Sequence, residues 1–456
     1  MRSTRIKSEG RKGTRNQSQL SLAVFATLLL IAVIIGGGGV RYGIANLIVQ
    51  LCALLLLAVR GDSVLGFWRQ APLSLRAVLG LSICVPLIQI IPLPESVWSI
   101  LPGRELVQQS FALTGRSGWA PISVDPVRTA VALTGMIVPI AVVTAGWTAK
   151  RRHLVLLGWV VVGLGLLNVC IGIPQVLSGG TAGRIYAGPS ATGILYGTFA
   201  NRNSTGLLLV SALSLAAMLP APKPHHFVLP ARITICALLM TAIILTRSRT
   251  ALVLAAIPVA LVLLKMVVER RNGKSGPRRS NLFLASAVLL GLGAVTAVLT
   301  IAPGRVNDTV ERFQTQSDAR SYIWEDSLYS ASRYWPVGAG MGTFDEVFQT
   351  DESLENATER RAGRAHNDYL EIAIEAGLPG LILIALWLIL TGWFAWRARH
   401  SQLRWMAWAA ASILLAIALQ SITDYPLRNQ AMLGIAAFAL LLLARIAERP
   451  EEEASP

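Results

Sequence analysis

The chain has 456 residues, of which 53% are hydrophobic and only 14% are charged, and its formal net charge is +16. Soluble domains carry about 25% charged residues, so this composition excludes both a soluble enzyme and a disordered chain. The excess of basic residues is therefore first a signal of membrane topology, and nucleic acid is not an expected partner.

A basic tail at residues 1–19 is followed by twelve apolar segments of about 20 residues, the length of a helix that crosses a bilayer. They predict spans at 20–39, 42–59, 73–93, 129–149, 153–177, 204–219, 226–246, 249–268, 281–302, 377–396, 404–423 and 429–447. The runs are continuous, which excludes a barrel of alternating strands. The predicted fold is an all-α polytopic membrane protein with five parts: 1–19, 20–302 (spans one to nine), 303–376 (a large outer loop), 377–447 (spans ten to twelve) and 448–456.

The lysines fix the orientation of these spans. All six fall on one side if the basic tail is cytoplasmic: Lys7, Lys12, Lys150, Lys223, Lys265 and Lys274. Cytoplasmic loops carry an excess of Lys and Arg, so the tail faces the cytoplasm, and twelve spans place both termini there. The four cysteines lie singly within apolar runs, which predicts neither a disulfide framework nor a metal site.

The loop 303–376 is the longest outer segment. It has no lysine, but it holds seven arginines and 14 of the 25 acids. Its pattern predicts a helix over 318–333, a turn at 336–342 and an acidic helix near 351–362. A charged, aromatic loop of this length is more than a connector and indicates a lid or a binding surface.

His366 is the one histidine predicted on the outer side of the membrane. The other four lie beside cytoplasmic basic loops: His153, His225, His226 and His400. Two interpretations are open for His366. It is either an interfacial polar residue, or a general base, because an imidazole titrates near ambient pH.

A helix is predicted directly after His366. Asn367 or Asp368 is expected to cap it, and Asp368, Glu371 and Glu375 fall near one face at helical spacing. Gly377 and Pro379 are expected to break the chain before span ten. This arrangement places His366 at a helix start, at the membrane surface.

Several arginines also lie at the outer membrane edge. Arg247 and Arg249 share the short turn between spans seven and eight, against the positive-inside trend. Arg202 enters span six, and Arg320 lies in the outer loop. One interpretation is snorkelling to lipid headgroups. The other is bidentate binding of a phosphate, which together with His366 favours an anionic, lipid-linked substrate and acid–base chemistry.

The order of four short motifs resembles the O-antigen ligase family, which includes O-antigen polymerase-like proteins. The motifs are Gly-Thr-Phe-x-Asn-Arg-Asn at 197–203, Ser-Arg-Thr-Ala at 248–251, Arg-x-x-x-Trp at 320–324 with Gly-x-Gly at 338–340, and His-Asn-x-Tyr-Leu-x-x-x-x-Glu-x-Gly-Leu-Pro-Gly at 366–380. The resemblance covers most of the chain, with its core at about 197–380. It implies a membrane glycosyltransferase of the GT-C type that takes a glycan from undecaprenyl diphosphate on the periplasmic face, without a metal or another cofactor.

The resemblance also implies roles for single residues. His366 matches the essential histidine of the family, a proposed base for the acceptor hydroxyl. A second group is expected to hold the donor diphosphate: Arg249, Arg320, Arg247 and Arg202. A third group lies in the same motifs and is expected to support these residues: Asn203, Asn367 and Glu375.

The leading hypothesis is an O-antigen ligase-like enzyme of the bacterial inner membrane that transfers the glycan to a lipid A-core hydroxyl. We expect inversion by single displacement, because no carboxylate stands out as a nucleophile. The close alternative is a polysaccharide polymerase, whose acceptor is a second lipid-linked glycan. A flippase or exporter, and a scaffold for polysaccharide assembly proteins, are the alternatives from other classes. Membrane lipid is an expected partner in each case.

Overall fold

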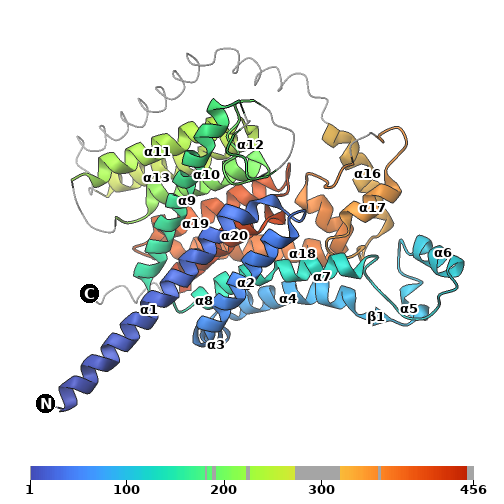
Figure 1. Ribbon diagram of the computed structural model, residues 1–456, viewed down its shortest axis with the longest axis horizontal. Coiled ribbons are helices and arrows are strands. Elements are labelled where there is room, and N and C mark those ends of the chain that lie inside the picture. The colour runs from blue at the N-terminus through green and yellow to red at the C-terminus, as the bar shows by residue number, and fades with distance from the viewer. Residues whose placement is uncertain are drawn as a thin grey trace.

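The computed structural model describes residues 2–179, 182–186, 192–221, 226–272, 319–357 and 361–448, without the side chains of 2–18 and 319. Its regular structure is almost entirely helical (Figure 1). The first helices are α1 (Arg2–Ile35), η1 (Gly36–Gly38), α2 (Gly43–Val59), α3 (Gly61–Gln70), α4 (Leu73–Ile90), α5 (Glu95–Trp98), α6 (Glu105–Leu113), α7 (Pro126–Gly135), α8 (Ile137–Gly146) and α9 (Arg151–Leu177). They are followed by α10 (Arg202–Met218), α11 (Val228–Leu245), α12 (Arg249–Leu254), α13 (Ala256–Arg271), α16 (Ala319–Arg333), α17 (Phe344–Asp351), α18 (Asp368–Arg397), η2 (Ala398–His400), α19 (Arg404–Gln420), η3 (Pro426–Arg428) and α20 (Gln430–Glu448). Two short strands, β1 (Pro92–Leu93) and β2 (Ala120–Pro121), pair antiparallel.

Within the described residues, eight helical segments are long and apolar enough to cross a membrane: Gln19–Gly38, Leu73–Ile90, Pro126–Gly146, Arg151–Leu177, Val228–Leu245, Arg249–Arg271, Asp368–His400 and Gln430–Glu448. The pair α2 and α3, bent by 76°, makes a ninth if it is one span. The sixth and eleventh predicted spans correspond to α10 and α19, which are shorter at 17 residues each. The ninth, 281–302, lies outside the described residues. The all-α polytopic fold is therefore confirmed, whereas the number twelve and the place of the large loop remain predictions.

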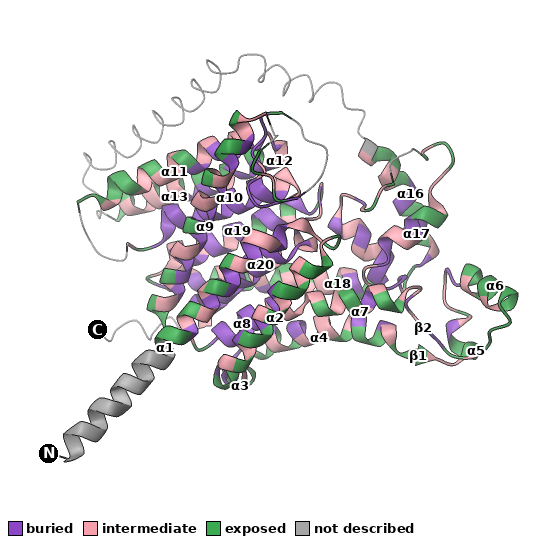
Figure 2. Ribbon diagram, in the orientation of Figure 1, coloured by how far each residue is buried: buried purple, intermediate pink, exposed green. Residues whose placement is uncertain are grey.

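Helices α10 and α20 form the centre of the bundle. The apolar window of α20 is 83% buried, against 17% for α11 and 28% for α4, and Figure 2 shows α10 and α20 as the most buried helices in the middle of the molecule. Outward-facing residues such as Ile44, Leu51 and Leu55 on α2 are more than half exposed. Apolar surface of this extent is expected where helices face lipid.

Helices α16 and α17 pack together at one end of the bundle, away from the start of α1 (Figure 1). The predicted helix at 318–333 is confirmed as α16, but the acidic helix predicted near 351–362 is wrong, since the helix here is α17, Phe344–Asp351. The spacing of Phe344, Val347 and Phe348 gives α17 one apolar face, which is buried in a small core. The stretch after Asp351 has no such face to bury.

A kink at Gly377 joins this outer unit to the membrane helices. The predicted break is confirmed: α18 consists of two helical stretches joined by a kink at Gly377, whose φ of 57° and ψ of −143° are not helical and interrupt the helical hydrogen bonds. The carbonyl groups of Ile374 and Glu375 instead accept hydrogen bonds from the amides of Ala339 and Gly340 at 2.8 Å. A Cβ at position 377 would lie 2.1 Å from the carbonyl oxygen of Pro336, so the close approach of the two segments requires glycine.

Candidate functional site

His366 is held in a strained backbone conformation. Of the residues that the structure describes, only His366 (φ 53°) and Arg247 (φ 52°) are non-glycine residues with positive φ, and both were predicted as site residues. Such a conformation costs about 1–3 kcal/mol and persists only where its surroundings fix it. Here the side chain of Asn367 caps α18 by accepting from the amides of Tyr369 and Leu370, and Trp324 Nε1 donates to the carbonyl of Ala365 at 2.8 Å.

A carboxylate lies directly behind the imidazole. His366 Nδ1 is buried and lies 3.6 Å from Oδ1 of Asp424, beyond hydrogen-bond length but within the range of an ion pair. The His366 side chain is 33% exposed overall, so its exposed edge is the one with Nε2. The ring of Tyr425 packs against it with centroids 4.9 Å apart. A buried carboxylate at Nδ1 with Nε2 exposed is the arrangement that orients a histidine base.

Asp424 is fixed by two amides at the start of α10. Nδ2 of Asn203 donates to its Oδ2 at 2.7 Å, and Nδ2 of Asn201 donates to the same atom at 3.0 Å. Burial raises the pKa of Asp424, but His366 and the Asn203 amide lower it more, so that the pKa lies below its ordinary value. Burial and the charge of Asp424 raise the pKa of Tyr425 to about 12, which keeps the phenol neutral at physiological pH.

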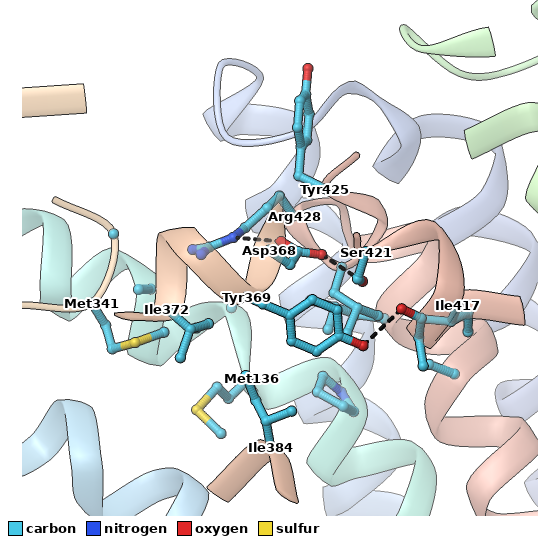
Figure 3. Close-up of a pocket in the computed structure, with 18 of the residues that line it drawn as sticks. Met136, Met341, Asp368, Tyr369, Ile372, Ile384, Ile417, Ser421, Tyr425 and Arg428 are labelled. Atoms are coloured by element: carbon cyan, nitrogen blue, oxygen red, sulfur yellow. Dashed lines mark hydrogen bonds and ion pairs between the residues drawn. The ribbon is translucent and has the colours of Figure 1, made fainter. Parts of the chain in front are cut away.

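Arg428 holds the start of α18. Its guanidinium lies 3.4 Å from Asp368, 3.3 Å from Glu371 and 3.0 Å from Glu375, each distance measured from a different nitrogen. The predicted shared face of these carboxylates is thus confirmed, and it is the buried face. Figure 3 shows Arg428 reaching Asp368, whose other oxygen accepts from Ser421 at 2.9 Å. These contacts fasten the helix that follows His366 to the connection that carries Asp424.

The predicted arginines approach this network from two directions. Ser248, which stands between Arg247 and Arg249, donates to Oδ1 of Asn203 at 2.8 Å, so Asn203 links their turn to Asp424. Arg202 is the first residue of α10, beside Asn203. On the other side of the site, the charges of Arg320 and Arg364 lower the pKa of Tyr425 against the stronger effect of burial. The structure thus gathers the segments that carry all the predicted site residues.

A cavity of about 1920 Å³ opens beside His366. Its wall near His366 is polar, with Arg364, Asp368, Tyr425 and Arg428. The wall along the membrane helices is apolar: Leu383, Trp387, Leu388, Leu414, Leu415 and Leu440. The residues that line it do not include Arg202, Arg247, Arg249 or Arg320. The cavity is therefore amphipathic, with a polar end at His366 and an apolar wall along the membrane helices.

Sequence reasoning missed Asp424 and Arg428. Both lie in the short connection between predicted spans eleven and twelve, which was treated as part of the membrane domain. One signal was present: between Arg404 and Arg445 these two are the only charged residues. Like Arg247 and Arg249, Asp424 and Arg428 are charged residues in a short outer turn between two spans. The same pattern therefore marked them as candidate site residues.

The chain resembles a known protein family over part of its length. Residues 234–385, about a third of the chain, match the family model described as O-antigen ligase. The match confirms the resemblance to the O-antigen ligase and polymerase-like family, whose members are glycosyltransferase-like. It includes Arg247, Arg249, Arg320 and His366 and ends before Asp424. A comparison with curated proteins gave no match.

Proposed function

We propose that this chain, with its O-antigen ligase domain at 234–385, transfers a glycan from undecaprenyl diphosphate to an acceptor hydroxyl on the periplasmic face of the bacterial inner membrane. His366 is the general base, and Asp424 orients it. The preferred acceptor is a lipid A-core sugar. The polymerase alternative uses the same chemistry with a second lipid-linked glycan as acceptor.

The observation that carries the proposal is the His366–Asp424 pair beside an amphipathic cavity. The Nε2 edge of His366 is exposed, whereas Nδ1 is buried 3.6 Å from Asp424. The apolar wall formed by α18, α19 and α20 suits a polyprenyl chain, and the polar wall suits the sugar to be transferred. The arginines proposed below for the diphosphate lie outside the cavity lining, on segments that reach His366 and Asp424 through Asn203 and Tyr425. An ordinary phosphate-binding site would not need an apolar extension of this size.

The chemistry follows from what a glycosyl transfer requires. A sugar hydroxyl is too weak an acid to ionise at neutral pH, so Nε2 of His366 takes its proton as the oxygen attacks the anomeric carbon. The bond from that carbon to the diphosphate breaks, and the diphosphate leaves with the electron pair. Arg249 and Arg320, with Arg247 and Arg202, are proposed to stabilise the charge that develops there. Attack opposite the leaving group inverts the anomeric centre.

A complementation experiment tests the proposal. A deletion strain would receive wild type, His366→Ala or the matched control His400→Ala, an exposed histidine in η2. We expect wild type and His400→Ala to restore polymer on lipid A-core, and His366→Ala to leave the polymer on its carrier lipid at normal protein level. If wild type instead lengthens single repeat units or restores secreted polymer, the protein is a polymerase.

Two further experiments separate the flippase and scaffold hypotheses. If the protein is a flippase or exporter, the purified protein should form no transfer product when donor and acceptor are supplied together in detergent. A scaffold would tolerate His366→Ala in cells. Full complementation by His366→Ala would therefore refute the catalytic proposal.

A further inference from the structure

We propose that the outer rim of the cavity binds donor sugars beyond the first and selects against acidic ones. The outer rim consists of Tyr322, Asp326, Asp345, Glu352, Asn356 and Arg361. This inference rests on the proposed function, because it takes the donor glycan as the ligand.

The position of the rim suits this role. Its residues come from α16, α17 and the segment after α17, outside the helices that are apolar enough to cross the membrane. They line the same cavity as His366, whereas the wall formed by α18, α19 and α20 is apolar. A donor with its lipid against the apolar wall and its first sugar at His366 would extend its remaining sugars toward the rim.

The rim offers an aromatic surface beside fixed hydrogen-bond acceptors. Tyr322 and Asp326 are one turn apart on α16 and share a face. Tyr322 is 50% exposed, which leaves ring surface for the C–H face of a sugar. Oδ2 of the buried Asp326 accepts from the amide and hydroxyl of Ser353 and from Nδ2 of Asn356, each at 3.2 Å. Its carboxylate is thus held in place before a ligand arrives.

The six rim residues carry three carboxylates and one guanidinium, and Arg128, which lines the same cavity from α7, is paired with Glu346 at 2.8 Å. Arg361 forms a two-pronged ion pair with Asp345, Nε to Oδ1 and Nη2 to Oδ2, both at 2.7 Å. The charges of Arg361 and Asp345 cancel, so the negative charge of the rim comes from the carboxylates of Asp326 and Glu352. Sugar hydroxyls and amino groups can donate to carboxylates, whereas a uronic acid would meet like charge. The rim therefore differs in sign from the arginine-rich region proposed for the diphosphate.

The test compares three donors in a detergent assay with the full chain and lipid A-core from the deletion strain. The donors are undecaprenyl diphosphates that carry one neutral sugar, a neutral trisaccharide, or a trisaccharide with uronic acid at its third position. We expect wild type to show kcat/KM at least about tenfold higher for the neutral than for the acidic trisaccharide. Glu352→Lys should reduce that ratio below about threefold. The matched control Glu355→Lys, a neighbouring exposed acid that does not line the cavity, should keep it.

The single-sugar donor separates the two proposals. It does not reach the rim, so its kcat and KM should be the same in wild type, Glu352→Lys and Glu355→Lys. If wild type transfers none of the three donors, the proposed function fails. If it transfers the single sugar but does not discriminate between the trisaccharides, or if Glu355→Lys acts like Glu352→Lys, the rim proposal is overturned and the proposed function stands.

Discussion

Replacing Asp424 with asparagine tests whether His366 acts through its buried partner. The two side chains are nearly the same size, so the main loss is the negative charge 3.6 Å from Nδ1. With an effective dielectric constant of about 20, that separation is equivalent to about 4–5 kcal/mol between full charges, an upper bound. Because the imidazole is one-third exposed, solvent screening roughly halves this to about 2 kcal/mol. A barrier raised by that amount slows kcat about 30-fold.

The assay would follow transfer from undecaprenyl-diphosphate donor to lipid A-core by purified protein in detergent. Asp424 touches His366 rather than the proposed substrate, so kcat should fall while KM for the donor changes little. The control is Asn203→Ala, which removes one amide donor to Asp424 but keeps the carboxylate, and should cost only a few-fold. A correctly inserted Asp424→Asn protein with wild-type kcat, or with its whole loss in KM, would refute the orienting role.

Four further outcomes are expected. His366→Ala should abolish transfer at normal protein level, measured as product per mole of inserted protein. Arg249→Lys should lower kcat about tenfold or more, since an ammonium lacks the planar fork that grips a diphosphate; full activity would disprove bidentate binding. Arg428→Met should lower the free energy of unfolding by about 3–5 kcal/mol, because it leaves buried carboxylates without their cation; thermal unfolding in detergent measures this. Finally, the folded-state pKa of Asp424 lies below the ordinary 3.8, so its ionisation stabilises the fold above that pH and the stabilisation is lost as pH falls through the lower, folded-state pKa. The stability difference between wild type and Asp424→Asn should thus be present at pH 5 and shrink as pH falls below 3.8, and a difference that grows over that acid range would contradict the stated pKa direction.

The sequence predicted the elements whose signal is local. Helical runs, the cap at Asn367 and the shared face of Asp368, Glu371 and Glu375 follow from composition and from a period of 3.6 residues. The acidic helix predicted at 351–362 failed because charge is not a helix signal, and the apolar spacing that forms α17 lies earlier. Asp424 escaped prediction because its role depends on contacts with residues more than 50 positions away in the chain, such as His366 and Asn203. No local pattern encodes such a partner.

The contacts of Arg428 and Asp368 set the position of His366 relative to Asp424. Arg428 binds the carboxylates on α18, and the amide of Asp368 donates to the carbonyl of Ser421 at 2.8 Å, so the segments that carry His366 and Asp424 form one packed unit. The outer rim lies on α16, α17 and the segment after α17. These elements contact that unit through the turn packed at Gly377 and through Trp324 of α16, whose Nε1 donates to the carbonyl of Ala365. Glu352, the rim position chosen for substitution, takes part in neither contact, so its replacement is expected to change which glycan is bound without changing the distance between His366 and Asp424. This separation is what a membrane glycosyltransferase family needs in order to keep one chemistry while its glycans and acceptors differ.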